Sequence, residues 1–224
     1  MRVINLLPEN KASLMVWEPS DEMNPFSGAD PTDLENLYEI MKTIPQKTKT
    51  LYGKKYSEPR HVALFGQHSY AYSGCVYEPE PPCGGDTLIE KSKHWVEQQF
   101  PGLKWNDALV NLYIDGTHSV DWHKDDEKTI EPGSPIVSFS FGPGASARTF
   151  EVSKSRTKKD IVYSTKTTHG MILAMCGPNF QTDLYHRVPP ITNTKTHPNR
   201  SDVDWRINIT YRVKLTTRAP RSGV

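Results

Sequence analysis

The sequence has few of the features that mark exported, membrane-spanning or disulfide-stabilised proteins. Its three cysteines, Cys75, Cys83 and Cys176, are odd in number and lack CxxC spacing, which argues against a disulfide framework and a cysteine zinc site. No stretch is apolar for the length that a membrane span requires. The segment from Met1 to Pro8 holds one Arg and an apolar run too brief for a signal peptide. We therefore expect a soluble intracellular protein, cytoplasmic or nuclear and not secreted.

The chain also lacks an excess of either charge, because 27 Lys and Arg residues are balanced by 26 Asp and Glu residues, for a formal net charge of +1. Such a balance neither requires nor excludes a polyanionic partner, since binding depends on where the cations lie. Two basic clusters stand out: Lys47, Lys49, Lys54, Lys55 and Arg60 in one, and Lys154, Arg156, Lys158 and Lys159 in the other. Each cluster, taken alone, is equally compatible with a solvated loop and with phosphate contacts.

No GxSxG, Walker or Rossmann pattern occurs, and 224 residues suit one domain with a substantial core. Two segments have helical spacing. Thr32 to Glu35 has the form of a capping box, and apolar residues recur at helical spacing as far as Ile44, until Pro45 stops the pattern. A second helix is predicted to begin at Asp86 and to end at Pro101.

The rest of the chain favours β-strands separated by Gly, Pro, Asn and Asp. Alternating or β-branched runs predict strands at Ala108–Ile114, Pro135–Phe141, Thr149–Val152, Ile161–Ser164, Met171–Met175 and Trp205–Leu215. An α/β fold would interleave helices with strands, whereas here the strands follow the helices. We therefore predict a mainly β fold with packed helices, an α+β protein built on a β-sandwich or jelly roll.

A possible metal site is indicated by His123-Lys124-Asp125 and by a distant histidine, His186. His123 and Asp125 are two residues apart, so in an extended segment they project from the same face. Two histidines and one carboxylate form the facial arrangement that leaves iron(II) open positions. From ligand chemistry alone, a structural zinc site or plain surface histidines remain open alternatives.

A second pattern predicts an anion site. The segment from Arg206 to Arg212 alternates polar and apolar residues, so Arg206, Asn208, Thr210 and Arg212 share one face of a strand. Buried guanidinium groups need anions, and the planar fork of Arg matches a carboxylate, so a dicarboxylate would satisfy both arginines. Asn111 and Tyr113 have the same alternation and supply further hydrogen bonds. An exposed strand face with charged residues is the alternative for each strand.

Taken together, these motifs resemble the AlkB-type family of nucleic-acid demethylases, over roughly residues 51–215. The resemblance is carried by Asn111-x-Tyr113, His123-x-Asp125, Ser134-Pro135-Ile136-Val137-Ser138, Phe141-Gly142, Arg148-Thr149-Phe150, His169-Gly170-Met171, His186-x-Val188-Pro189 and Arg206-x-Asn208-x-Thr210-Tyr211-Arg212. It implies a double-stranded β-helix, which is a jelly roll, together with Fe(II), 2-oxoglutarate and O2. It further implies that His123, Asp125 and His186 bind the metal, and that 2-oxoglutarate is held by Asn111, Tyr113, Arg206, Asn208 and Arg212.

The same resemblance implies residues that bind the extruded base of the substrate. These predicted substrate-binding residues are Tyr52, Arg60, Tyr70, Tyr72, Glu127 and Arg148. Tyr72 would stack the base against His123, and Tyr52 would occupy a hairpin tip that in the family wedges into duplexes. Glu127 would contact an exocyclic amino group. Aromatic core positions for Tyr70 and Tyr72 and a surface position for Arg148 are the alternatives.

The implied function is oxidative demethylation of N-alkylated bases in DNA or RNA, such as N1-methyladenine or N3-methylcytosine, with release of formaldehyde, succinate and CO2. The alternatives are a 2-oxoglutarate dioxygenase that acts on a protein or small molecule, and an inactive nucleic-acid-binding relative. We expect a monomer without a membrane partner. One dioxygenase domain would span 1–224: an N-terminal extension with a helix at 1–50, a nucleotide-recognition lid at 51–85, a helix plus jelly-roll core at 86–215, and a tail at 216–224.

Overall fold

The computed structural model describes residues 1–51, 54–67, 69–72, 75–81, 87–192 and 199–215, with side chains except those of residues 49, 51 and 70–72. Its α-helices are α1 Pro31–Thr43, α2 Leu88–Gln99 and α3 Phe180–Asp183. Its strands are β1 Arg2–Leu7, β2 Ala12–Trp17, β3 Thr48–Leu51, β4 Lys54–Ser57, β5 His61–Gly66, β6 Tyr70–Tyr72, β7 Cys75–Tyr77, β8 Asp107–Tyr113, β9 Val120–His123, β10 Ile136–Phe141, β11 Thr149–Ser153, β12 Ile161–Lys166, β13 Ile172–Cys176, β14 Tyr185–Val188 and β15 Arg206–Arg212. None of the helices within these ranges has the length and apolar character needed to cross a membrane.

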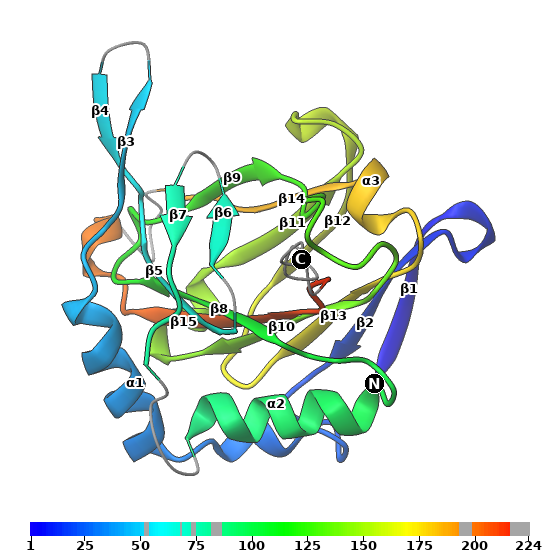
Figure 1. Ribbon diagram of the computed structural model, residues 1–224, viewed down its shortest axis with the longest axis horizontal. Coiled ribbons are helices and arrows are strands. Elements are labelled where there is room, and N and C mark those ends of the chain that lie inside the picture. Colours follow the sequence, from blue (N-terminus) through cyan, green and yellow to red (C-terminus); the bar gives the residue numbers. More distant parts are fainter. Residues whose placement is uncertain (52–53, 68, 73–74, 82–86, 193–198, 216–224) are drawn as a thin grey trace, which may run out of the picture.

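Two packed sheets form the body of the protein. The larger sheet has the strand order β1-β2-β13-β10-β15-β8-β5, and the smaller sheet has the order β12-β11-β14-β9. Figure 1 shows α1 and α2 along one face of the larger sheet, with the smaller sheet on the opposite side. The β3–β4 and β6–β7 hairpins are separate two-stranded sheets. This is the mainly β architecture with packed helices that the sequence predicts.

Alternation along the strands divides the core into two layers. On β15, Ile207, Ile209 and Tyr211 face the helices, where they pack in one cluster with Trp95 of α2 and Met41 of α1. The second apolar cluster lies between the two sheets, where side chains from β2, β10 and β13 meet Phe150 and Val152 of β11. Successive side chains point to opposite faces of a strand, so the other face of β15 turns toward the smaller sheet.

The residue that caps each long helix is visible in the structure, and for α1 it differs from the predicted one. The side chain of Asp30, and not Thr32, caps α1 by accepting a hydrogen bond from the Thr32 N–H, and Pro31 occupies the first helical position. The predicted capping box at Thr32 is therefore wrong by two residues. Thr87 caps α2, where it accepts from the N–H of Glu90 at 3.4 Å. The predicted start of this helix at Asp86 lies outside the described residues.

Two strands within the first 17 residues belong to the larger sheet, although the sequence patterns predicted no strand there. β2 pairs antiparallel with β13, and β1 pairs with β2 at the sheet edge. Trp17 of β2 packs edge-on against Trp95 at a ring separation of 5.2 Å, and Leu14 is fully buried. The N-terminal segment therefore contributes to both layers of the core.

We predict that Leu14→Ala destabilises the fold by about 2–5 kcal/mol, because truncation of a buried leucine loses transfer free energy and leaves a cavity. Val3→Ala is the matched control on the neighbouring strand, since Val3 is 54% exposed. Chemical denaturation of both variants measures the difference. Equal free energies of unfolding in the two variants would contradict the placement of β2 in the core.

Candidate active site

The register of the smaller sheet places two histidines opposite each other. His123 ends β9 and pairs directly across the strands with His186 of β14. Their ring centroids are 4.1 Å apart. Paired residues on antiparallel strands project from the same face, so both imidazoles point toward the larger sheet and into the interior.

Asp125 joins the two imidazoles from the segment that follows β9. Its Oδ2 atom lies 3.7 Å from Nε2 of His186, and the ligand atoms of His123, Asp125 and His186 all lie within 4.8 Å of one another. Arg212 of β15 donates from Nη2 to both carboxylate oxygens, at 3.0 and 3.1 Å. This buried ion pair connects the segment that follows β9 to strand β15 of the larger sheet.

All three groups are held in the protonation states that a metal ion requires. Burial opposes ionisation of Asp125, but the charge of Arg212 and the two imidazoles outweigh it and lower the pKa of the carboxyl to about 2. Burial lowers the pKa of His186 to about 3 and also lowers the pKa of His123. His123 donates from Nδ1 to the Asp121 carbonyl at 2.8 Å, which leaves the lone pair of Nε2 available. Two neutral imidazoles and one carboxylate suit a divalent first-row metal such as iron(II).

Polar residues of β15 and β8 line a cavity next to this cluster, which we call the inner cavity. The two strands are paired so that Arg206 lies opposite Tyr113 and Asn208 lies opposite Asn111. The structure brings all eight residues predicted for metal and 2-oxoglutarate into the lining of this one cavity: Asn111, Tyr113, His123, Asp125, His186, Arg206, Asn208 and Arg212. The alternative of exposed strand faces is excluded, because both strands are buried along their whole length.

Arg206 retains unused hydrogen-bonding capacity inside the inner cavity. Its Nη2 atom donates to Ser140 Oγ at 2.8 Å, and its guanidinium lies 5.2 Å from the centre of the Tyr113 ring. Its Nε and Nη1 atoms are buried with no hydrogen-bond partner among the described residues. Burial lowers the pKa of Arg206 from its usual value, as expected for a cation that lacks solvent. A buried guanidinium with donor atoms that lack a partner can accept an anion such as a carboxylate.

The amides of Asn208 and Asn111 are held by their neighbours. Asn208 donates to Ser138 Oγ at 2.7 Å and to the Phe139 carbonyl at 2.8 Å. Asn111 accepts from Arg60 Nε at 2.8 Å. These bonds fix the orientation of both amide groups in the cavity wall.

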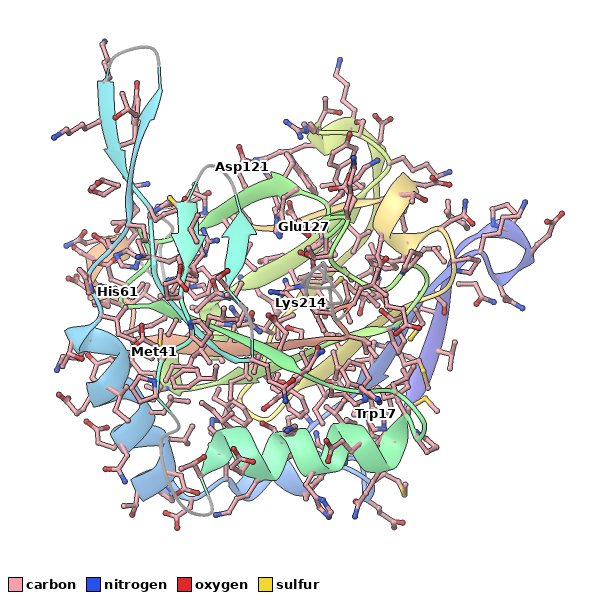
Figure 2. All side chains as sticks on the ribbon, in the orientation of Figure 1. Trp17, Met41, His61, Asp121, Glu127 and Lys214 are labelled. Atoms are coloured by element: carbon pink, nitrogen blue, oxygen red, sulfur yellow. The ribbon has the colours of Figure 1, made fainter. Side chains whose placement is uncertain are left out.

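A second, outer cavity adjoins the inner one and shares Arg60, Val120 and His123 with it. Four carboxylate side chains contribute to its lining: Glu58, Asp121, Asp126 and Glu127. Figure 2 shows Asp121 and Glu127 on the same side of the molecule, beside β9. The outer cavity is thus partly acidic, and one imidazole of the His-Asp-His cluster borders both spaces.

The predicted substrate residues do not all meet there. Glu127 lines the outer cavity, and Arg60 also borders it, although Arg60 is only 4% exposed and pairs with Glu58 at 3.2 Å. Its guanidinium is therefore not a surface contact for phosphate. Tyr52 lies outside the described residues, as do the side chains of Tyr70 and Tyr72, whose backbone forms β6.

Arg148 is placed in the core and lines neither cavity. It is fully buried, donates to the His118 carbonyl at 2.6 Å and also bonds the Asp115 carbonyl. Its guanidinium lies 5.1 Å from the Tyr113 ring, on which Arg206 also packs. Burial lowers the pKa of Arg148 to about 10. The surface alternative for Arg148 is excluded, and the structure points to a role in holding Tyr113 and the β8–β9 loop.

Sequence reasoning missed several residues of the outer cavity. Asp121 precedes His123 by two residues, so the same spacing that paired His123 with Asp125 was available to identify it. No sequence pattern indicated Glu58, because only the tertiary fold brings Glu58 and its partner Arg60 to this cavity. Lys124, Arg156 and Tyr185 also line this cavity and come from three separate segments.

Comparison with known proteins agrees with this geometry. Residues 31–212 match the model of the 2OG-Fe(II) oxygenase superfamily. A solved structure of OsALKBH1 superposes with a TM-score of 0.54 at 17% identity and covers 89% of this chain and 97% of that chain, which supports the same fold.

Two human proteins are similar in sequence. The alpha-ketoglutarate-dependent dioxygenase alkB homolog 3 is 32% identical over 185 residues, which are 79% of this chain and 59% of that protein. The DNA oxidative demethylase ALKBH2 is 31% identical over 197 residues, which are 82% of this chain and 69% of that protein. The chain thus spans about three fifths of the length of alkB homolog 3. It belongs to the 2OG-Fe(II) oxygenase superfamily, in the AlkB-type family of these relatives.

Proposed function

We propose that this protein is an Fe(II)- and 2-oxoglutarate-dependent demethylase of N-alkylated bases in DNA or RNA. The reaction would consume O2 and 2-oxoglutarate and release formaldehyde, succinate and CO2. Family membership supports the cofactors, and the names of alkB homolog 3 and ALKBH2 support the reaction class. The observation that carries the proposal is that His123 borders both a cavity lined with arginines and a partly acidic cavity. Cosubstrate and substrate would therefore meet at the metal.

The residues present fit an iron ion. His123, Asp125 and His186 would hold it, because they offer two neutral nitrogens and one ionised oxygen in a buried cluster. Three protein ligands leave positions for 2-oxoglutarate and oxygen. When bound, the iron and its cosubstrates supply an oxidant capable of hydroxylating an N-methyl group. The protein holds the methyl group near the cluster and keeps water away.

The inner cavity fits 2-oxoglutarate. Arg206 would donate to one carboxylate from Nη1, one of its two donor atoms without a partner, and this contact would offset the cost of burying the cation. Tyr113, Asn111 and Asn208 would complete the hydrogen bonding around the acid. Arg212, which is bonded to Asp125, would lie at the end that chelates the metal.

The outer cavity fits a positively charged base. N1-methyladenine and N3-methylcytosine carry a positive charge at neutral pH, which Asp121, Asp126 and Glu127 would favour. A carboxylate also accepts from the exocyclic amino group of adenine or cytosine. Unmodified bases are neutral and would gain less from this lining.

We also infer that the two small hairpins form the nucleotide-recognition lid. Neither β3–β4 nor β6–β7 belongs to the two main sheets, and Figure 1 shows the β3–β4 hairpin projecting from the body. The Glu58–Arg60 pair lies directly after β4 and borders the outer cavity. The lid would thus be anchored at the point where the base enters.

We predict that His186→Ala lowers demethylation by more than about 100-fold, because loss of a metal ligand should exceed the 10- to 100-fold cost typical of changes around the ligands. Formaldehyde release from an oligonucleotide with N1-methyladenine measures the activity, and equilibrium dialysis measures Fe(II) binding. His94→Ala on α2 is the control, since His94 is exposed. Full activity of His186→Ala would contradict the site, and turnover by the wild type of non-nucleic substrates only would contradict the function.

Arg206→Gln should raise the KM for 2-oxoglutarate by about 10- to 100-fold, since a charge-assisted hydrogen bond contributes about 1.5–3 kcal/mol. Succinate formation at varied 2-oxoglutarate concentrations measures this constant. Arg2→Gln, on the exposed edge strand β1, should leave it at the wild-type value. A folded Arg206→Gln variant with an unchanged KM would place the cosubstrate elsewhere.

Asp121→Asn and Asp126→Asn should each lower kcat/KM on N1-methyladenine by about 1.4- to 5-fold, because an exposed charge pair contributes about 0.2–1 kcal/mol. Activity on neutral N6-methyladenine in the same oligonucleotide should change less. Glu22→Gln, which removes an exposed carboxylate outside the cavity, is the control. Equal losses on the charged and the neutral base would rule out charge selection by these groups.

A further inference from the structure

A buried ion pair lies in the wall between the inner and the outer cavity. Arg60 lines both cavities, and its Nη1 atom lies 3.2 Å from Oε2 of Glu58, which lines the outer one. Only 2% of Glu58 and 4% of Arg60 are exposed. Two charges at this depth interact strongly, because little solvent screens them. Glu58 therefore cancels much of the charge that Arg60 presents to the outer cavity.

Arg60 also acts on the inner cavity, through Asn111. Its Nε atom donates to Asn111 Oδ1 at 2.8 Å, and Asn111 belongs to the lining of the inner cavity. The side-chain amide of Asn has one accepting oxygen and one donating NH2 group. A bond from Arg60 to the oxygen directs the NH2 group away from Arg60. Arg60 thus determines which end of this amide is presented to a molecule in the inner cavity.

Backbone hydrogen bonds hold the segment that carries the pair. The N–H of Glu58 donates to the Lys47 carbonyl at 2.7 Å, across the base of the β3–β4 hairpin. The N–H of Ser119, just before β9, donates to the Pro59 carbonyl at 2.9 Å. Residues 58–60 are therefore held from two sides by main-chain contacts. A substitution that changes only the charge of Glu58 should leave this segment in place.

The positive charge of Arg60 opposes the binding of a cationic base. The described lining of the outer cavity holds four carboxylates and three cations, which are Arg60, Lys124 and Arg156. Without the charge of Glu58, three carboxylates would face three cations. Arg60 would then repel a positively charged ring without a neighbouring counter-charge. Retention of an arginine in this wall thus requires an acidic partner.

We propose that Glu58 is a specificity-determining residue, because its carboxylate neutralises Arg60 and lets Arg60 orient Asn111 without repelling a cationic base. The inference rests on the proposed function, since it places 2-oxoglutarate in the inner cavity and the alkylated base in the outer one. Arg60 is a positioning residue in this arrangement, because it acts on the cosubstrate through Asn111. The pair gives the wall a hydrogen-bond donor for one cavity and little net charge toward the other.

The first test is Glu58→Gln, which keeps a hydrogen-bond acceptor for Arg60 and removes the negative charge. Fluorescence anisotropy measures Kd for an oligonucleotide with one N1-methyladenine and for the unmodified strand. Fe(II) and 2-oxoglutarate are present and O2 is excluded, so no turnover occurs. The preference for the methylated strand should fall by about 3- to 10-fold, because one unit charge is lost beside the cationic ring. An unchanged preference, or a wild type with no preference, would overturn the proposal.

Asp107→Asn is the matched control for the loss of a buried charge. Asp107 is 2% exposed, and its Oδ2 atom lies 2.5 Å from Lys214 Nζ in another buried ion pair. It is not part of the lining of either the inner or the outer cavity. The control should keep the wild-type preference. An equal loss in this variant would overturn the proposal, because the effect would then come from reduced stability.

The double variant Glu58→Gln, Arg60→Gln separates the two contacts of Arg60. With both charges removed, the preference for the methylated strand should return to the wild-type value. Affinity for 2-oxoglutarate, measured by calorimetry without O2, should stay about 2- to 10-fold lower, the range of one lost hydrogen bond. A purely structural role would predict a greater loss of preference in the double variant than in Glu58→Gln. That result, or wild-type affinity for 2-oxoglutarate in the double variant, would overturn the proposal.

These binding measurements need no turnover, so they are independent of the proposed reaction. A wild-type protein that prefers the methylated strand but releases no formaldehyde in air would refute demethylation. The same result would leave the role of Glu58 in base selection supported. The double variant has no uncompensated charge at this position, so it tests the proposal even when Glu58→Gln fails to fold.

Discussion

The ion pair between Asp125 and Arg212 is the interaction on which the rest of the site depends. Both groups are almost fully buried, so removal of either one leaves an uncompensated charge, a change that typically costs 3–5 kcal/mol. The pair keeps the carboxylate ionised and connects the His-Asp-His cluster to β15 of the larger sheet. The His-Asp-His cluster and the inner cavity therefore share one electrostatic contact.

β15 shows why fold and site cannot be separated in this protein. Its alternate side chains lie on opposite faces of the sheet. Ile207 and Ile209 pack against the helices, whereas Arg206 and Asn208 face the inner cavity. A shift in register by one residue would place guanidinium groups against the helices and isoleucines in the cavity. The pairing with β8 and β10 on both sides fixes this register. The stability of the larger sheet thus sets the geometry of the anion site.

Local periodicity in the sequence was enough to predict which side chains share one face of a strand. The face shared by Arg206 and Arg212 followed from alternation alone, and the structure confirms it. The pairing of His123 with His186 depends on contacts between strands far apart in the chain, so periodicity could not predict it, and only ligand chemistry and the family resemblance connected the two residues. The burial of Arg148 could not be predicted, because its acceptors are backbone carbonyls of a remote loop. The N-terminal strands were missed for a similar reason, since β2 is defined by its docking on β13.

The near-neutral net charge does not describe how charged side chains are distributed over the molecule. Four carboxylates line the outer cavity together with Arg60, Lys124 and Arg156, and further exposed cations lie on the β3–β4 and β11–β12 hairpins. A nucleic acid strand has the complementary pattern when it carries a cationic methylated base, because the phosphates are negative and the base is positive. Under the proposed function, discrimination between charged and neutral bases would arise only when the base enters the outer cavity. Binding of a nucleic acid in this way would require no net positive charge on the protein, because local electrostatic fields rather than the total charge determine where a polyanion binds.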